Sequence, residues 1–301
     1  MWLLDTACGP PTLGTYSQRV ERITNTIGQL PARSLKPERI ARWQSDLLKS
    51  GLASGTVADV RVTLHQVLEI HPRCTVRVVS HSPHVDMPAA VYDASAEGYI
   101  RFVGVEISAA TEGPVDRSLL GAFVELMADA PAGRVADLGC GPGRVAAFLA
   151  AHEFDVFGVD VSAAMVVAAR NAHPTIEFEQ GQLTALPIAD ASLACAVCWY
   201  SIIYTPPEHL DDVCLELSRV MAPGGYLLVA FQAGQGEGLH QANAHGTNRP
   251  LTSYRHDPDV VIRTLSGTGL KVHLRALREP QFTHESSPQA FIIARAEPPQ
   301  P

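Results

Sequence analysis

An apolar run followed by a glycine-rich turn, residues 135–144, constrains the fold of this chain more than any other feature. The four residues before the first glycine read as a buried strand, Gly139, Gly141 and Gly143 form a turn, and a helix is predicted to follow. The next apolar run ends at Asp160. Glycines let backbone N–H groups approach a ligand, and a carboxylate after the second strand can accept hydrogen bonds from both ribose hydroxyls. The pattern predicts a site for a nucleoside-bearing cofactor.

Two cofactor classes use a strand, a glycine turn and a carboxylate. A dinucleotide site has the pattern Gly-x-Gly-x-x-Gly/Ala, which seats a pyrophosphate on the N-terminus of the next helix. Residues 141–146 match that pattern only with the first glycine late in the turn. Asp137, two residues before Gly139, would also place a negative charge beside the phosphates. A carboxylate there suits a cationic ligand, so a dinucleotide enzyme is the less favoured alternative.

Five segments, in order and spacing, resemble those of one family. Residues 135–144 are similar to motif I of class I S-adenosylmethionine (SAM) methyltransferases, hhDhGCGxGR. The other four segments are 91–99 (YDxxAxxY, a helix that lids the cofactor), 160–165 (D-x-S-x-x-M), 181–187 (GDaxxLP) and 217–225 (RVLKPGG). The resemblance covers about residues 88–297. It implies SAM as the cofactor.

The resemblance also implies roles for single residues. Asp137 is expected near the methionine end of the cofactor, and Met165 against the adenine. Gln182 stands where the family usually has aspartate, the acceptor for the adenine amino group; glutamine also accepts, but it is longer and uncharged. The full expected cofactor-binding set is Tyr99, Asp137, Gly139, Cys140, Gly141, Gly143, Asp160, Val161, Met165, Gln182, Leu183, Trp199 and Tyr200.

The residues after the fourth predicted strand are expected to face the acceptor, because ligands of open α/β sheets bind at the carboxyl ends of the strands. Trp199 could equally be a core residue. Tyr204 and His284 are the candidates for a catalytic group. His284 belongs to a late polar cluster that could instead be solvated loop; its other members are His240, His245, Tyr254, Arg255, His256 and Glu285. No group of residues predicts a metal site.

The order of the apolar segments predicts the fold class. After a helix that follows residue 113, strands alternate with helices, with strands expected at 135–138, 156–159, 176–178, 195–199, 227–231, 272–277 and 290–294. Such alternation gives a parallel sheet covered by helices on both faces. Only a loop separates the last two strands, which predicts a hairpin and an antiparallel edge strand. The expected fold is α/β: a Rossmann-like, doubly wound, mostly parallel seven-stranded sheet with a small N-terminal all-helical segment.

The N-terminal part of the chain differs in pattern and charge. Residues 1–80 hold 10 Lys/Arg and 6 Asp/Glu, which leaves 13 of the 23 basic and 25 of the 31 acidic residues to the remainder. Residues 12–70 resemble the core-binding helical domain of phage-type tyrosine recombinases, but the catalytic domain expected after it is absent. The segment either has no function of its own or contacts DNA weakly. We predict three parts: a helical segment 1–70, a linker 71–87 and a methyltransferase domain 88–297.

Composition narrows the setting of the protein. The chain is 46% hydrophobic and 18% charged, as expected for a globular protein. Its start lacks the basic and apolar regions of a signal peptide, and its longest nearly apolar run, 193–204, is too short to cross a bilayer. The six cysteines read as reduced thiols of a cytoplasmic protein. Cys195 and Cys198, three apart in a predicted strand, should point to opposite faces of the sheet and lie in its core.

These features predict methyl transfer from SAM to a small-molecule acceptor. The acidic remainder of the chain argues against a polyanionic substrate such as duplex DNA. One alternative is a DNA-binding adaptor whose SAM-binding domain is not catalytic. A less favoured one is an NAD(P)-dependent oxidoreductase.

Overall fold

The computed structural model describes residues 83–297, with side chains from Pro88 onward. The predicted recombinase-like segment 1–70 and most of the predicted linker lie outside the described residues. The first described helix, α4 (Pro83–Val103), begins inside the segment predicted as linker. No helix in the described part of the chain is long and apolar enough to span a membrane.

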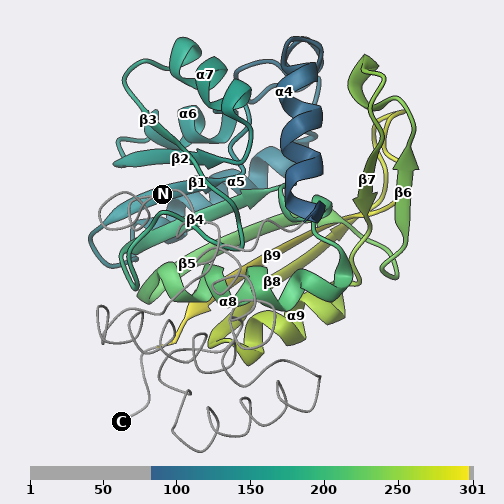
Figure 1. Cartoon of the computed structure of the whole chain (residues 1–301). Coiled ribbons are helices and arrows are strands. Elements are labelled where there is room, and N and C mark those ends of the chain that lie inside the picture. Colours follow the sequence, from purple (N-terminus) through teal and green to yellow (C-terminus); the bar gives the residue numbers. More distant parts are fainter. Residues whose placement is uncertain (1–82, 298–301) are drawn as a thin grey trace, which may run out of the picture. The chain divides into compact units, whose positions relative to one another are not determined.

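A seven-stranded sheet forms the centre of the described residues, in the order β3-β2-β1-β4-β5-β9-β8 (Figure 1). Its strands are β1 (Arg134–Leu138), β2 (Val156–Asp160), β3 (Glu177–Gln180), β4 (Leu193–Trp199), β5 (Met221–Gln232), β8 (Leu270–Arg278) and β9 (Gln289–Ala296). The strands β3, β2, β1, β4 and β5 pair in parallel. The predicted fold class, a mostly parallel sheet of seven strands, is confirmed.

The antiparallel strand is not at the edge, where the sequence placed it. β9 pairs antiparallel with both β5 and β8, so β8 is the edge strand and runs in the same direction as the parallel strands. The hairpin folds back into the sheet and inserts β9 beside β5. The order of the strands along the chain does not reveal this insertion, because the insertion depends on which strand pairs with the edge of β5.

Helices cover both faces of the sheet, as Figure 1 shows. On one face lie α5 (Pro114–Met127), α6 (Arg144–Ala150) and α7 (Ala163–Ala172), and on the other α8 (Leu210–Val220) and α9 (Pro258–Gly267). A single turn with proline at its first position, η3 (Pro207–His209), precedes α8. The two faces have separate hydrophobic cores. Cys195 belongs to one core and Cys198 to the other, which confirms both as core residues on opposite faces.

A small arm between β5 and α9 was not predicted from the sequence. It consists of β6 (Gly238–Gln241), the single turn η4 (Ala244–Gly246) and β7 (Leu251–Tyr254), and it stands beside α4 (Figure 1). The strand β6 is exposed and β7 is partly buried, so neither shows the alternation of a half-buried strand. Ala244 and Leu251 of the arm nevertheless pack with Val91 of α4 in a buried cluster. The arm and α4 are therefore held together by apolar contact.

Candidate functional site

The glycine turn after β1 has a backbone that only glycine adopts freely. Gly139, Gly141 and Gly143 have φ angles of 77°, 52° and 85°, in the left-handed region. A Cβ on Gly139 would also lie 2.2 Å from the Cβ of Ser201. The turn therefore needs glycine both for its conformation and for the close approach of the loop after β4.

Asp160 connects the ends of two loops at this turn. Its Oδ2 accepts a hydrogen bond from the Gly141 backbone N–H at 2.8 Å, and its Oδ1 accepts one from the Ser162 N–H at 2.8 Å. Burial raises the pKa of this carboxyl, while the two N–H donors oppose the rise. Each carboxylate oxygen can accept a further hydrogen bond. Asp160 therefore keeps the capacity to bind a pair of ribose hydroxyls.

Asp137 lies deeper than the sequence implied. Its Oδ2 accepts a hydrogen bond from the Ala146 N–H at 2.9 Å, and its side chain is buried under the start of α6. Burial raises its pKa to about 7, and the charge of Asp160 adds to the rise. In the structure this residue joins β1 to the first turn of α6. Its place near the methionine end of the cofactor stays a prediction.

The helix α4 lies against the predicted cofactor loops as a lid. Oδ1 of Asp93 accepts hydrogen bonds from the Ser162 hydroxyl at 2.6 Å and the Ala164 N–H at 3.0 Å, which fixes α4 to the start of α7. Further along α4, the ring of Tyr99 lies 3.9 Å from the position of a Cβ on Gly141. Within the 91–99 motif, Asp93 therefore binds the start of α7, and Tyr99 lies against the glycine turn.

At the opposite end of the expected site, Gln182 carries an acceptor that has no partner. Its Oε1 is buried and makes no hydrogen bond to any described residue. An unpaired buried acceptor is costly and is the group that an adenine amino group would satisfy. The neighbouring expected residues Val161 and Leu183 are half-buried, and Cys140 is buried. Met165, only 1% exposed, packs against Val91, Tyr92, Ala244 and Leu251, so its contacts in the structure are with the lid and the arm.

The loop after β4 holds the expected acceptor-side residues. Trp199 is buried and packs on Phe291, with ring centroids 5.6 Å apart. Of the two positions considered from the sequence, it therefore occupies the one in the core. Its Nε1 is buried without a hydrogen-bond partner among the described residues. Tyr200 has a left-handed φ of 57°. A strained backbone and an unpaired polar atom at one strand end are typical of a ligand site.

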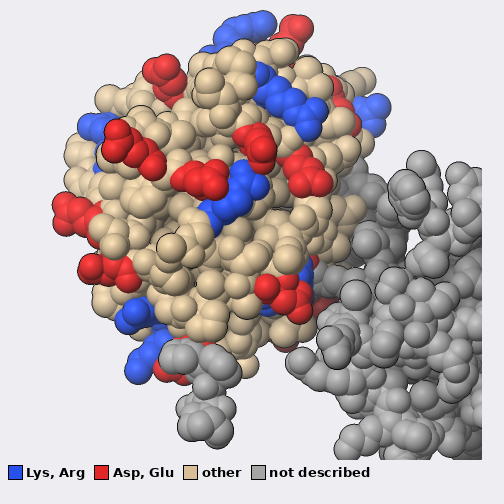
Figure 2. Space-filling view, turned by 90° about the vertical axis from the view of Figure 1, so that its left-hand side faces the viewer, with Lys and Arg blue, Asp and Glu red and all other residues tan. Residues whose placement is uncertain are grey.

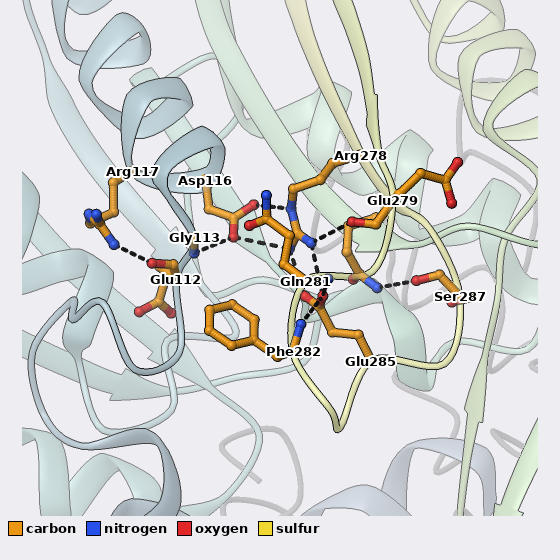
Figure 3. A network of polar contacts seen from close by, with 11 residues as sticks. Glu112, Gly113, Asp116, Arg117, Arg278, Glu279, Gln281, Phe282, Glu285 and Ser287 are labelled. Atoms are coloured by element: carbon orange, nitrogen blue, oxygen red, sulfur yellow. Dashed lines mark hydrogen bonds and ion pairs between the residues drawn. The ribbon is translucent and has the colours of Figure 1, made fainter.

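A buried ion-pair network lies at the end of β8 (Figure 3). The guanidinium of Arg278 donates to both oxygens of Asp116 on α5, at 2.8 and 3.0 Å, and to both oxygens of Glu285, at 2.9 and 2.6 Å. It also donates a hydrogen bond to the Tyr200 hydroxyl. The network fixes the segment that follows β8 against α5 and against the loop after β4.

An aromatic cluster lies between the lid, the arm and the loop after β4. The hydroxyls of Tyr92 and Tyr204 share a hydrogen bond, and the ring of Tyr92 also meets the rings of Tyr99 and His245 at 5.1 and 5.2 Å. Burial raises the pKa of all three tyrosines. The structure therefore places the predicted residues Tyr99 and Tyr204 together. It adds Tyr92, which the sequence analysis named only within the 91–99 motif, and His245, which it named only as one member of the late polar cluster.

His284, the other catalytic candidate, lies elsewhere in the described structure. It is exposed and stacks on Phe282 at a centroid distance of 5.3 Å, with the edge of Phe102 against it. No contact joins it to Tyr204. The sequence could have indicated Tyr92, which opens the tyrosine pair of the 91–99 motif. Nothing in the sequence separates His245 from the other histidines of the late polar cluster.

The comparison with protein families agrees with these features. Residues 135–225, from β1 to the turn inside β5, match the family model described as a methyltransferase domain. The central part of the chain therefore resembles a methyltransferase domain. The match contains Asp160, Gln182 and all three glycines of the turn, whereas α4 and the arm lie outside it.

Curated relatives match parts of this chain. A malonyl-[acyl-carrier protein] O-methyltransferase from Erwinia billingiae is 34% identical over 111 residues, which cover 37% of this chain and 43% of the relative. A trans-aconitate 2-methyltransferase from Azoarcus sp. is 36% identical over 123 residues, covering 39% and 47%. Each match spans less than half the length of the relative. A third relative, a malonyl-[acyl-carrier protein] O-methyltransferase from Serratia marcescens, is 26% identical and covers 64% and 79%.

Solved structures share the fold at low sequence identity. Magnesium protoporphyrin IX methyltransferase from Synechocystis PCC 6803, with bound SAM, has a TM-score of 0.53 at 16% identity and covers 73% of this chain and 100% of that one. The [4+2]-cyclase SpnF has a TM-score of 0.55 at 15% identity, covering 72% and 97%. Since one of these proteins is named a methyltransferase and the other a cyclase, the fold by itself does not decide the reaction.

Proposed function

We propose that this protein transfers a methyl group from SAM to a small-molecule acceptor. The observation that carries the proposal is the geometry of Asp160, whose two oxygens bind the glycine turn and the start of α7 while keeping capacity for ribose hydroxyls. The match to a methyltransferase domain supports the same reading. When bound, SAM supplies a methyl group already activated by its sulfonium. The protein then has to align the acceptor and exclude water.

The residues divide the proposed cofactor site into three parts. Asp160 binds the ribose, the unpaired Oε1 of Gln182 accepts from the adenine amino group, and the turn Gly139–Gly143 lets its backbone approach the methionine part. The helix α4 covers the site, with the ring of Tyr99 beside Gly141 of the turn. The small-molecule class of acceptor is supported by relatives named for trans-aconitate and a malonyl-carrier substrate. The face drawn in Figure 2 also supports it, because its basic side chains are scattered among acidic ones and form no continuous basic surface.

Two measurements on the full chain test the proposal. Calorimetry should show binding of SAM and S-adenosylhomocysteine and no binding of NAD. Incubation with methyl-labelled SAM and a metabolite extract should transfer the label to a small compound and release S-adenosylhomocysteine. Binding of SAM without transfer to any compound would favour a non-catalytic SAM-binding protein. Binding of NAD instead of SAM would favour an oxidoreductase.

The proposal also includes the domain boundaries and the cellular location of the protein. We propose that the domain includes residues 88–297, that residues 1–70 are a separate segment and that the protein is cytoplasmic. The cysteines in the described range, Cys140, Cys195, Cys198 and Cys214, are free and buried, which supports a reducing setting. The resemblance of residues 12–70 to a recombinase domain, and the DNA contact it implied, concern residues that the structure does not describe. A gel-shift assay of the full chain with duplex DNA at two salt concentrations tests that contact.

A further inference from the structure

The arm between β5 and α9 holds His245 in an unusual backbone conformation. Its φ is 50°, inside the single turn η4. A residue with a side chain keeps such a conformation only where its surroundings impose it, and such residues gather at functional sites. At His245 the neighbouring residues of the turn hold the backbone in place. Ala244 is fully buried, and its carbonyl accepts hydrogen bonds from the Thr247 N–H and the Thr247 hydroxyl. The arm therefore presents the His245 ring in one direction.

The His245 ring faces the proposed cofactor site. It lies 5.2 Å from the ring centroid of Tyr92 and 5.2 Å from that of Tyr99. Tyr99 lies beside Gly141 of the glycine turn, and the hydroxyl of Tyr92 bonds that of Tyr204 after β4. The same three tyrosines feel the charge of Asp160. The imidazole thus lies against two tyrosines of the lid, and these contact the glycine turn and the loop after β4.

One nitrogen of this ring has no partner. Nε2 of His245 is buried and makes no hydrogen bond to any described residue. Burial also lowers the pKa of His245, so the ring is neutral at pH 7. A neutral imidazole with a free nitrogen in a pocket can accept a proton from a ligand. The ring as a whole is only half-buried, which leaves the accepted proton a path to water.

The charges around the tyrosines that face His245 favour a neutral ligand at that nitrogen. These tyrosines are neutral hydroxyls, and the charges that act on them come from Asp160, Glu112 and Arg144. The guanidinium of Arg144, next to the glycine turn, pairs with Glu112 at 2.6 Å. An anionic acceptor would meet the Asp160 carboxylate, and Arg144 is already paired. A neutral hydroxyl acceptor would meet a base.

We infer that His245 is the general base of the proposed methyl transfer and that the acceptor reacts through a neutral hydroxyl group. The inference rests on the proposed function. In this step the acceptor oxygen forms a bond to the methyl carbon, and its proton moves to Nε2 of His245. The carbon–sulfur bond breaks with its electron pair on sulfur, leaving neutral S-adenosylhomocysteine and an imidazolium. Tyr92 and Tyr204 position the ring and the hydroxyl by contact and hydrogen bonding.

The first test uses the full chain, methyl-labelled SAM and a metabolite extract. Mass spectrometry and NMR of the labelled compound should place the label in a new methyl ether. His245→Ala should then lower kcat by about 100-fold or more, the usual effect of losing a general base. Its affinity for S-adenosylhomocysteine, measured by calorimetry, should stay within twofold of wild type, and added imidazole should restore part of the rate. The matched control is His240→Ala, an exposed histidine on β6 of the same arm, which should change neither quantity.

A second readout does not depend on turnover. In NMR of histidine-labelled protein with S-adenosylhomocysteine, the resonance lost in His245→Ala should titrate below the ordinary histidine pKa of about 6.5. A label found on nitrogen, carbon, sulfur or a carboxyl group would overturn the inference and leave the proposed function standing. So would a His245→Ala rate within threefold of wild type, or a His245 resonance that titrates at or above that ordinary value. If no compound gains label although SAM binds, the proposed function fails and the inference with it.

Discussion

The backbone N–H of Gly141 donates a hydrogen bond to Oδ2 of Asp160 at 2.8 Å, across the ends of two neighbouring strands. One carboxylate therefore sets the shape of the glycine turn and forms the proposed ribose site. Losing it should damage both. Asp160→Ala is expected to weaken SAM binding by about 1.5–3 kcal/mol, the scale of charge-assisted hydrogen bonds. Calorimetry on this variant checks the value, with Asp129→Ala, an exposed carboxylate after α5, as the control. Unchanged affinity would remove Asp160 from the site.

Gly139→Ala should disrupt the turn, because the new Cβ would lie 2.2 Å from the Cβ of Ser201 at a φ of 77°. We expect a lower melting temperature and loss of SAM binding. Gly121→Ala is the matched control: its position within α5 has no atom within 4 Å of the added Cβ. A helical glycine-to-alanine change stabilises by about 0.5–1 kcal/mol. Scanning calorimetry of both variants should therefore give shifts of opposite sign.

Gln182→Asp should bind SAM as well as wild type or better. The adenine amino group donates hydrogen bonds, and a carboxylate accepts about twice as strongly as an amide. Gln182→Leu, which has no acceptor, should weaken binding by about 1 kcal/mol, a typical net hydrogen bond. Titration calorimetry with SAM measures both. If the aspartate variant loses more than about 1 kcal/mol, the Oε1 of Gln182 serves another partner, and its assignment to adenine is wrong.

Asp137 should make stability depend on pH. Its pKa is about 7 when folded and near 3.8 when unfolded, so the folded state binds the extra proton between these values. Stability therefore falls as pH rises from about 4 to 7, by up to roughly 4 kcal/mol from this group. Asp137→Asn keeps an acceptor for the Ala146 N–H but does not titrate. Urea unfolding at several pH values should show a shallower decline for this variant. Parallel curves for the two proteins would show that Asp137 ionises freely in the fold.

The two arginines of β8 offer a direct comparison of buried and exposed ion pairs. Arg278→Met leaves Asp116 and Glu285 buried without their partner and should cost about 3–5 kcal/mol of stability. Arg275→Met on the same strand removes an exposed pair with Asp259 and should cost at most about 1 kcal/mol. Urea unfolding of both variants gives the difference. Equal losses would mean that the Arg278 network adds no more than a surface pair.

The central domain could be predicted from its sequence because its signals are local. The strand before Gly139, the glycine spacing and the carboxylate at Asp160 lie within 26 residues, and each depends on backbone rules that act over a few positions. The opposite orientation of Cys195 and Cys198 follows in the same way from the period of a strand. These local rules determined the sheet, its helices and the position of the cofactor turn.

Tertiary structure alone decided the rest. The insertion of β9 between β5 and β8, the contact of the arm with α4 and the meeting of Tyr92, Tyr204 and His245 join segments up to 160 positions apart in the printed sequence. Such meetings depend on which apolar surfaces bury one another, and no periodicity along the chain records that choice. The sequence therefore determined where a cofactor could bind. Only packing decided which histidine, His245 and not His284, lies beside it.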